Sequence, residues 1–204
     1  MITNGTALLV GLFILASGAD PEAHLLGGAA AFRDGRWADA LVEFRVAERL
    51  GAEDARPYAG AALVKLGRAE EALEAFGGVR SPGRDALLDY YHALACHDAR
   101  LYLCAERLLA GIGDRSGPRI AAEAAKVRAA IAAALASEPE AAAIDWYLAR
   151  GAALEAEGRR ALAAAFCHEA VGLAGRRRDR HRLEEARRAV ARLEAAASAA
   201  GGAP

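Results

Sequence analysis

Apolar residues recur at spacings of three and four along most of this chain, which is the pattern of amphipathic helices. Gly, Pro, Ser and Asp interrupt the pattern at short intervals, where helices usually begin and end. No stretch alternates apolar and polar residues as a strand does. The pattern predicts an all-α protein with about 9–11 helices. We place them at 21–34, 37–50, 54–66, 68–76, 85–97, 100–109, 118–136, 142–157, 160–174 and around 183–193.

One stretch recurs along the chain. Arg33–Phe44 returns as Lys65–Phe76, with Gly, Arg, an acidic residue, Ala, Leu and Phe at matching places 32 residues apart. A weaker third copy passes through Ala99-Arg100, and the Gly-Arg pair recurs at Gly158-Arg159. A period of this length is typical of solenoids, in which one supersecondary unit is stacked on the next.

Small residues flank each predicted turn and predict close packing of the two helices of a unit. They lie seven residues before the turn and five after it, so they face each other across the hairpin. The first set is Gly28, Gly60 and Gly151, with His92 in the third copy, and the second is Ala40, Ala72, Cys104 and Ala163. We expect the bulky residues that follow, Phe44, Phe76 and Leu108, to pack on the next unit.

These repeated residues resemble the tetratricopeptide repeat, whose usual period is about 34 residues. The resemblance implies a right-handed antiparallel helix-hairpin solenoid. It places three hairpins in 20–112, an extra helix with loops in 113–141, a fourth hairpin in 142–175, and an amphipathic helix with a tail in 176–204. The chain departs from the family in its period of 32 and in lacking the prolines that often close each unit.

The resemblance also implies a peptide-binding groove, because the first helix of each unit lines the concave face in that family. The groove positions are Leu25, Phe32, Arg33, Val64, Lys65, Asp89, Cys96, His97, Leu148 and Glu155. Arg33, Lys65 and His97 lie 32 residues apart, so we predict a basic row that binds an acidic peptide. Family members that clamp a terminal carboxylate use Asn together with Lys or Arg. Asn4 is the single Asn of this chain, so we do not expect that clamp in its usual form.

The N-terminal residues are the most apolar part of the sequence. Ala7–Ala16 is an uninterrupted apolar run, about half the ~20 residues that a membrane span needs. Ser17-Gly18-Ala19 follows, which predicts a signal peptide in 1–19 that is cleaved after Ala19, and a periplasmic or cell-envelope location. No Lys or Arg precedes the run, so an apolar N-terminal helix of a cytoplasmic protein is the alternative.

Charge argues against nucleic acid as a partner. The formal net charge is −1, with 26 basic and 27 acidic residues. The densest basic run, Arg176–Arg182, carries no aromatic residue and is followed by Glu184-Glu185. We interpret it as the solvated start of a helix.

Residues that carry chemistry are few, and we predict no catalytic residue, cofactor or metal. The Ser residues fall at predicted helix boundaries and tails, and no phosphate-binding Gly-rich loop is present. The exception is His92, Cys96 and Cys104, which helical spacing and the hairpin bring together. Three interpretations of this cluster stay open: buried structural thiols, a Cys96–Cys104 disulfide, or a zinc site.

The predicted function is a non-enzymatic protein–protein interaction scaffold or assembly factor. Its partner would be a protein or an acidic peptide, or a second copy of the chain, and not a small-molecule substrate. Two alternatives remain: a metal-binding or small enzymatic protein that uses His92, Cys96 and Cys104, and a cytosolic regulatory repeat domain.

Overall fold

The computed structural model describes residues 20–52, 54–77, 85–112, 117–137 and 140–201, so the predicted signal peptide lies outside the described residues. Ten helices and no strand occupy these ranges, which confirms the all-α class. The helices are α1 (Pro21–Arg33), α2 (Trp37–Arg49), α3 (Ala55–Lys65), α4 (Ala69–Phe76), α5 (Ala86–Asp98), α6 (Tyr102–Ile112), α7 (Pro118–Ser137), α8 (Glu140–Ala156), α9 (Arg160–Arg177) and α10 (Arg180–Gly201).

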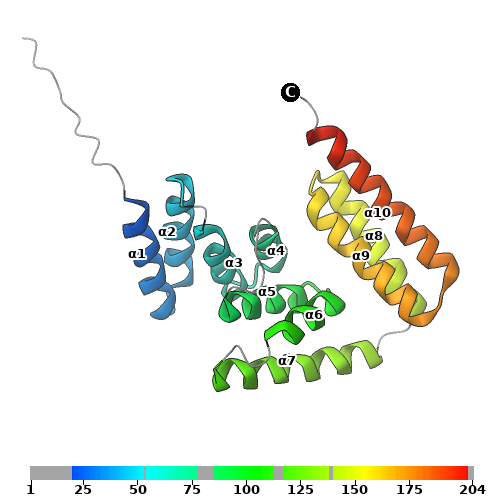
Figure 1. Ribbon diagram of the computed structural model, residues 1–204, viewed down its shortest axis with the longest axis horizontal. Coiled ribbons are helices and arrows are strands. Elements are labelled where there is room, and N and C mark those ends of the chain that lie inside the picture. Colours follow the sequence, from blue (N-terminus) through cyan, green and yellow to red (C-terminus); the bar gives the residue numbers. More distant parts are fainter. Residues whose placement is uncertain (1–19, 53, 78–84, 113–116, 138–139, 202–204) are drawn as a thin grey trace, which may run out of the picture.

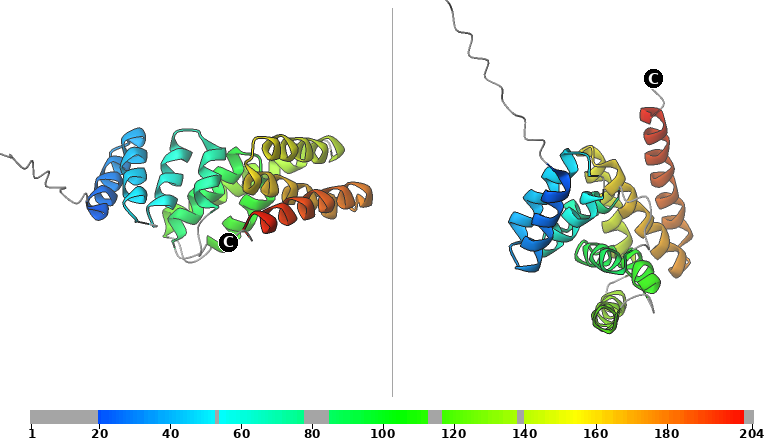
Figure 2. Two further views of the ribbon diagram at one scale, coloured as in Figure 1. Left: turned by 90° about the horizontal axis from the view of Figure 1, so that it is seen from above. Right: turned by 60° about the vertical axis from the view of Figure 1, so that its left-hand side comes forward.

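Successive helices pack on one another as antiparallel pairs (Figure 1). The pairs are α1–α2, α3–α4, α5–α6 and α8–α9, and α10 packs on α9 as the next helix of the series. Helix α7 lies along α5 and α6 and separates the third pair from the fourth in the sequence. Seen from above, α1 and α2 lie at one end of the molecule and the α8–α10 group at the other (Figure 2).

The same turn joins the helices of every pair. One residue takes a left-handed conformation, and the next donates its N–H to a carbonyl five residues back, which satisfies the end of the first helix. The left-handed residues are Gly35, Gly67, Arg100 and Gly158, with φ of 77°, 72°, 65° and 79°. The donor–acceptor pairs are Arg36–Ala31, Arg68–Leu63, Leu101–Cys96 and Arg159–Leu154.

This turn corrects the predicted register of the third hairpin. Its left-handed residue is Arg100, which lies 33 residues after Gly67, so the third unit contains one extra residue. Ala93 and Ala105 therefore occupy the two small-residue positions, and both are completely buried. The prediction that His92 and Cys104 fill those positions is wrong, and their side chains are available for other contacts.

Close packing across the first two hairpins follows the predicted small-against-large pattern. A Cβ on Gly28 would lie 2.6 Å from the Phe44 ring, and a Cβ on Gly60 would lie 3.0 Å from the Phe76 ring. Each ring also reaches the next unit. Phe44 lies 5.6 Å from the Tyr58 ring, and Phe76 stacks on His92 at 4.8 Å.

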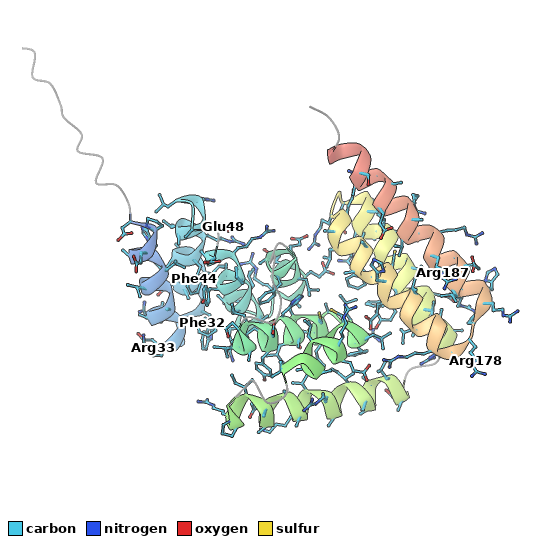
Figure 3. The ribbon with its side chains drawn as sticks, viewed as in Figure 1. Phe32, Arg33, Phe44, Glu48, Arg178 and Arg187 are labelled. Carbon is cyan, nitrogen blue, oxygen red and sulfur yellow. The ribbon has the colours of Figure 1, made fainter. Side chains whose placement is uncertain are left out.

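The C-terminal helices are joined to the rest by polar contacts. The Tyr147 hydroxyl donates to the backbone carbonyl of Arg100, and Arg176 pairs with Glu106 of α6. Arg178, at the foot of α9 in Figure 3, ends that helix with a φ of 57°. Within the described ranges, every helix is too short or too polar to cross a bilayer.

Candidate functional site

Four side chains from four helices meet on the N-terminal half of the molecule. Phe32 of α1 makes edge-to-face contacts with Trp37 and Tyr91, at 5.2 and 5.5 Å between ring centroids. The Lys65 ammonium lies 5.5 Å from the Trp37 ring and 5.6 Å from the Tyr91 ring, within cation–π range. We call these four residues the aromatic–lysine cluster.

Helix ends position this cluster. Phe32 lies in the last turn of α1 and Trp37 begins α2, so the turn at Gly35 brings the two rings together. Lys65 is the last residue of α3, and it is exposed although it lies between two rings. Its ammonium is therefore held at the surface, where its N–H groups can donate to an anionic group.

Of the predicted groove residues, Phe32 and Lys65 contact the same two rings and belong to the aromatic–lysine cluster, and the others are not part of it. Arg33 is exposed at the outer end of α1, as Figure 3 shows. Asp89 and Val64 are buried, whereas Leu25 and Leu148 are half-buried against the core. These last four positions contribute to packing more than to an open surface.

The predicted basic row does not extend to His97 in the third unit. The extra residue in the third unit places Asp98, rather than His97, at the position of Arg33 and Lys65. His97 contacts the Asp98 carboxylate at 3.0 Å and the Tyr102 ring at 6.0 Å. Glu155 is bound by Arg192 of α10 at 2.7 Å.

Sequence reasoning missed Trp37 and Tyr91. Trp37 stands at the first helical position after a turn, where the second hairpin has Ala69. The aromatic residue at that position could have identified Trp37 as a candidate site residue from the sequence. Tyr91 has no comparable signal, because its contacts come from α1 and α3, two elements that are distant in sequence.

A second cluster lies in the third hairpin. One ligand atom from each of His92, Cys96 and Cys104 lies within 4.8 Å of the others, and the two Sγ atoms are 2.7 Å apart. We call these residues the thiol–imidazole cluster. The structure thus confirms that they meet, and both cysteines are free thiols in it.

Burial sets the protonation of this cluster. Burial lowers the pKa of His92 to about 4, so its imidazole is neutral at pH 7. Burial also raises the pKa of Cys96, which is completely enclosed. The pKa of Cys104 is lowered, first by the hydrogen bond with Cys96 and also by nearby Arg107, so Cys104 is the thiol that ionises first.

Glu169 of α9 supports the cluster from the C-terminal half. Its carboxylate accepts the backbone N–H groups of Leu103 and of Cys104, the latter at 3.2 Å. These N–H groups lie in the first turn of α6, where a helix cannot satisfy them itself. Burial raises the pKa of Glu169 to about 7, although the two backbone hydrogen bonds and Arg107 act in the opposite direction.

A cavity of about 600 Å³ opens beside these groups, between α6 and α9. Cys104 and Arg107 line it from α6, and His168 and Glu169 line it from α9. Of the two thiols in the cluster, Cys104 alone lines this cavity, since Cys96 lies behind it.

An ion network joins α4 to the fourth hairpin. Arg150 and Arg159 bind the Glu70 carboxylate at 2.6 and 2.7 Å, and Arg159 also binds Glu74 at 2.6 Å. Burial alone would raise the pKa of Glu70, but the bonds from the two arginines outweigh it and lower the pKa. A second cavity, of about 460 Å³, lies next to this network, and Trp146 lines it with Arg100 against its ring at 4.7 Å.

Comparisons with known proteins give no match to a family model, a curated protein or a solved structure.

Proposed function

We propose that this protein is a non-enzymatic helical scaffold that binds a protein segment carrying an acidic side chain over the aromatic–lysine cluster. The observation that carries the proposal is the position of Lys65, whose exposed ammonium is held between the Trp37 and Tyr91 rings. A carboxylate would take a charge-assisted hydrogen bond from Lys65, and an adjoining apolar group would pack on the rings.

A protein segment suits this surface better than a small molecule. Neither of the two cavities described above is lined by a residue of the cluster. The cluster instead spans the ends of α1 and α3 and the start of α2, with α5 behind them. An extended segment can follow such a surface and contact several helices at once.

Two wider elements complete the proposal. The repeated turn supports a tetratricopeptide-type solenoid as the class of scaffold. We propose in addition that 1–19 directs export to the periplasm or cell envelope. Sequencing the mature N-terminus from separated periplasmic and cytosolic fractions tests export, which requires a chain beginning at Asp20.

Selection from a displayed library of random peptides tests the binding site. We expect selected peptides to be enriched in Asp and Glu, and the strongest one, synthesised, to bind Lys65→Glu about tenfold more weakly than wild type. Lys126→Glu is the matched control, because it makes the same charge change on exposed α7 and should leave affinity unchanged. A Trp146→Phe variant leaves Trp37 as the sole tryptophan, whose emission should shift on binding.

Three outcomes would overturn the proposal. They are a library that yields no binding peptide, a selected pool without acidic enrichment, and equal affinities of Lys65→Glu and wild type.

A further inference from the structure

Cys96 and Cys104 face each other across a hairpin turn. They can be two free thiols, a disulfide or two ligands of one zinc ion, and the distance between the sulfurs helps to distinguish these states. A disulfide requires about 2.05 Å between the sulfurs. Two thiolates on one tetrahedral zinc ion lie about 3.7 Å apart, since each Zn–S bond is about 2.3 Å. At 2.7 Å the sulfurs of Cys96 and Cys104 are in direct contact as free thiols, and a shared zinc ion would require them to separate by about 1 Å.

The available ligands also argue against a zinc site. A structural zinc site takes four ligands, and the described residues offer three here: His92, Cys96 and Cys104. The carboxylate of Glu169, which lines the cavity with Cys104, is already bound to the backbone N–H groups of α6. His92 is held flat against the Phe76 ring, with 14° between the ring planes.

We propose that Cys96 and Cys104 form a redox-active dithiol that closes to a disulfide by exchange with a low-molecular-weight disulfide entering through the cavity between α6 and α9. Cys104 is the attacking thiol, because it lines the cavity. Cys96 is the resolving thiol, because it is completely buried and lies in contact with Cys104.

The cavity provides a suitable environment for such a reagent. Arg107 and His168 line it with Cys104, and they present donors to the carboxylates of a glutathione-like disulfide. Arg107 also favours the thiolate form of Cys104, which is the nucleophile in exchange. Cys96 does not line this cavity, so the reagent reaches Cys104 first.

Exchange proceeds in two balanced steps. The Cys104 thiolate attacks one sulfur of the reagent RSSR, so a Cys104–SR mixed disulfide forms and RS⁻ leaves. The Cys96 sulfur then attacks the Cys104 sulfur, the second RS⁻ leaves, and the Cys96 proton goes to a released thiolate. The dithiol is oxidised by two electrons and RSSR is reduced to two thiols. The new bond ties α5 to α6.

Oxidised glutathione, added to the reduced full-length protein under native conditions, tests the proposal. Intact mass and alkylation after denaturation then count the thiols. In wild type we expect one free thiol, Cys167, and no retained glutathione. Cys96→Ala should keep one glutathione on Cys104, whereas Cys104→Ala should remain unmodified over the same time. Cys167→Ala is the control and should form the disulfide at the wild-type rate.

Several results would overturn the proposal. They are three free thiols in wild type after incubation, modification of Cys104→Ala as fast as Cys96→Ala, or a glutathione adduct on Cys167. Zinc that co-purifies at one ion per chain and protects both thiols until a chelator removes it would assign the cluster to a metal. Should Cys96→Ala fail to fold by circular dichroism, Cys96→Ser replaces it, and the wild-type thiol count decides by itself.

Discussion

The first two hairpins and the third share one turn geometry but are held together differently. In the first two, a glycine in one helix receives a phenylalanine from the other, as Gly28 does with Phe44. The third has Ala93 at that position and a left-handed arginine at its turn. Contacts from the fourth hairpin support it, through Tyr147 on the Arg100 carbonyl and Glu169 on the start of α6.

The first two hairpins are held by packing between their own helices, whereas the third also depends on contacts from a distant hairpin. Hairpins that pack by small-against-large contacts are stabilised by nearby residues. The third hairpin does not have this glycine-against-phenylalanine contact, and it encloses titratable and nucleophilic groups. Groups of this kind require support from distant elements, because a buried polar group without a partner is costly.

The largest effect we expect concerns pH and the third hairpin. Burial raises the pKa of Glu169 from 4.5 to about 7, so Glu169 lowers the unfolding free energy as pH rises between those values. Burial lowers the pKa of His92 from 6.5 to about 4, so His92 raises it as pH rises through that window. Each contribution is about 3 kcal/mol, and the two nearly cancel in wild type.

Single substitutions should reveal the two opposing slopes. Between pH 4.5 and 6.5, stability should rise with pH in Glu169→Gln and fall with pH in His92→Phe, relative to a flatter wild type. Urea unfolding at a series of pH values measures this. Groups common to all three chains drop out of the differences. Parallel curves for the three proteins would show that neither group titrates as described.

The next effect tests the small-against-large packing of the first hairpin. Gly28→Ala should destabilise the protein by about 2 kcal/mol, because its Cβ would lie 2.6 Å from the Phe44 ring. Gly27→Ala is the neighbouring control: its Cβ meets only the Glu43 side chain, at 3.5 Å, so higher helix propensity should stabilise by up to about 1 kcal/mol. Thermal unfolding compares the two. Equal effects of both substitutions would remove the packing argument.

A smaller effect isolates the turn. Gly67 has a φ of 72°, and a Cβ added there would meet nothing within 4 Å, so Gly67→Ala should cost about 1 kcal/mol from backbone strain alone. Gly175→Ala is the control, because that glycine also has open space but no positive φ. Chemical denaturation of both variants tests this, and a neutral Gly67→Ala would contradict the assigned turn.

The smallest effect concerns the ion network between α4 and the fourth hairpin. Glu70→Gln should destabilise by about 0.5 kcal/mol at low salt, and molar salt should abolish the difference, since these side chains remain partly exposed. Glu184→Gln is the control, because its pair with Arg187 lies within α10 and is more exposed. An effect of Glu70→Gln that is unchanged by salt would contradict an electrostatic origin.

Local sequence signals predicted the helices well, because their ends depend on nearby residues. Gly35, Gly67 and Gly158 were recognisable as turns, and the Asp20 side chain caps α1 by accepting the backbone N–H of Glu22. The third register was missed because its turn residue is Arg100, a residue type with no preference for a left-handed conformation. A 32-residue repeat therefore assigned the wrong residue to the turn.

The sites were harder to predict because they depend on contacts between distant segments. Helical spacing and the hairpin correctly placed His92, Cys96 and Cys104 together. Glu169 was missed because the N–H groups that it accepts lie 65 and 66 residues earlier in the chain. Neither a repeat period nor a local motif in a single sequence reveals a contact between residues so far apart in the chain.

Amide hydrogen exchange tests most directly the claim that the fourth hairpin supports the third. We predict that Glu169→Ala increases exchange in the first turn of α6, at Leu103 and Cys104, and leaves the first turns of α2 and α4 as in wild type. Unchanged protection in α6, or an equal loss in all three helices, would contradict the claim.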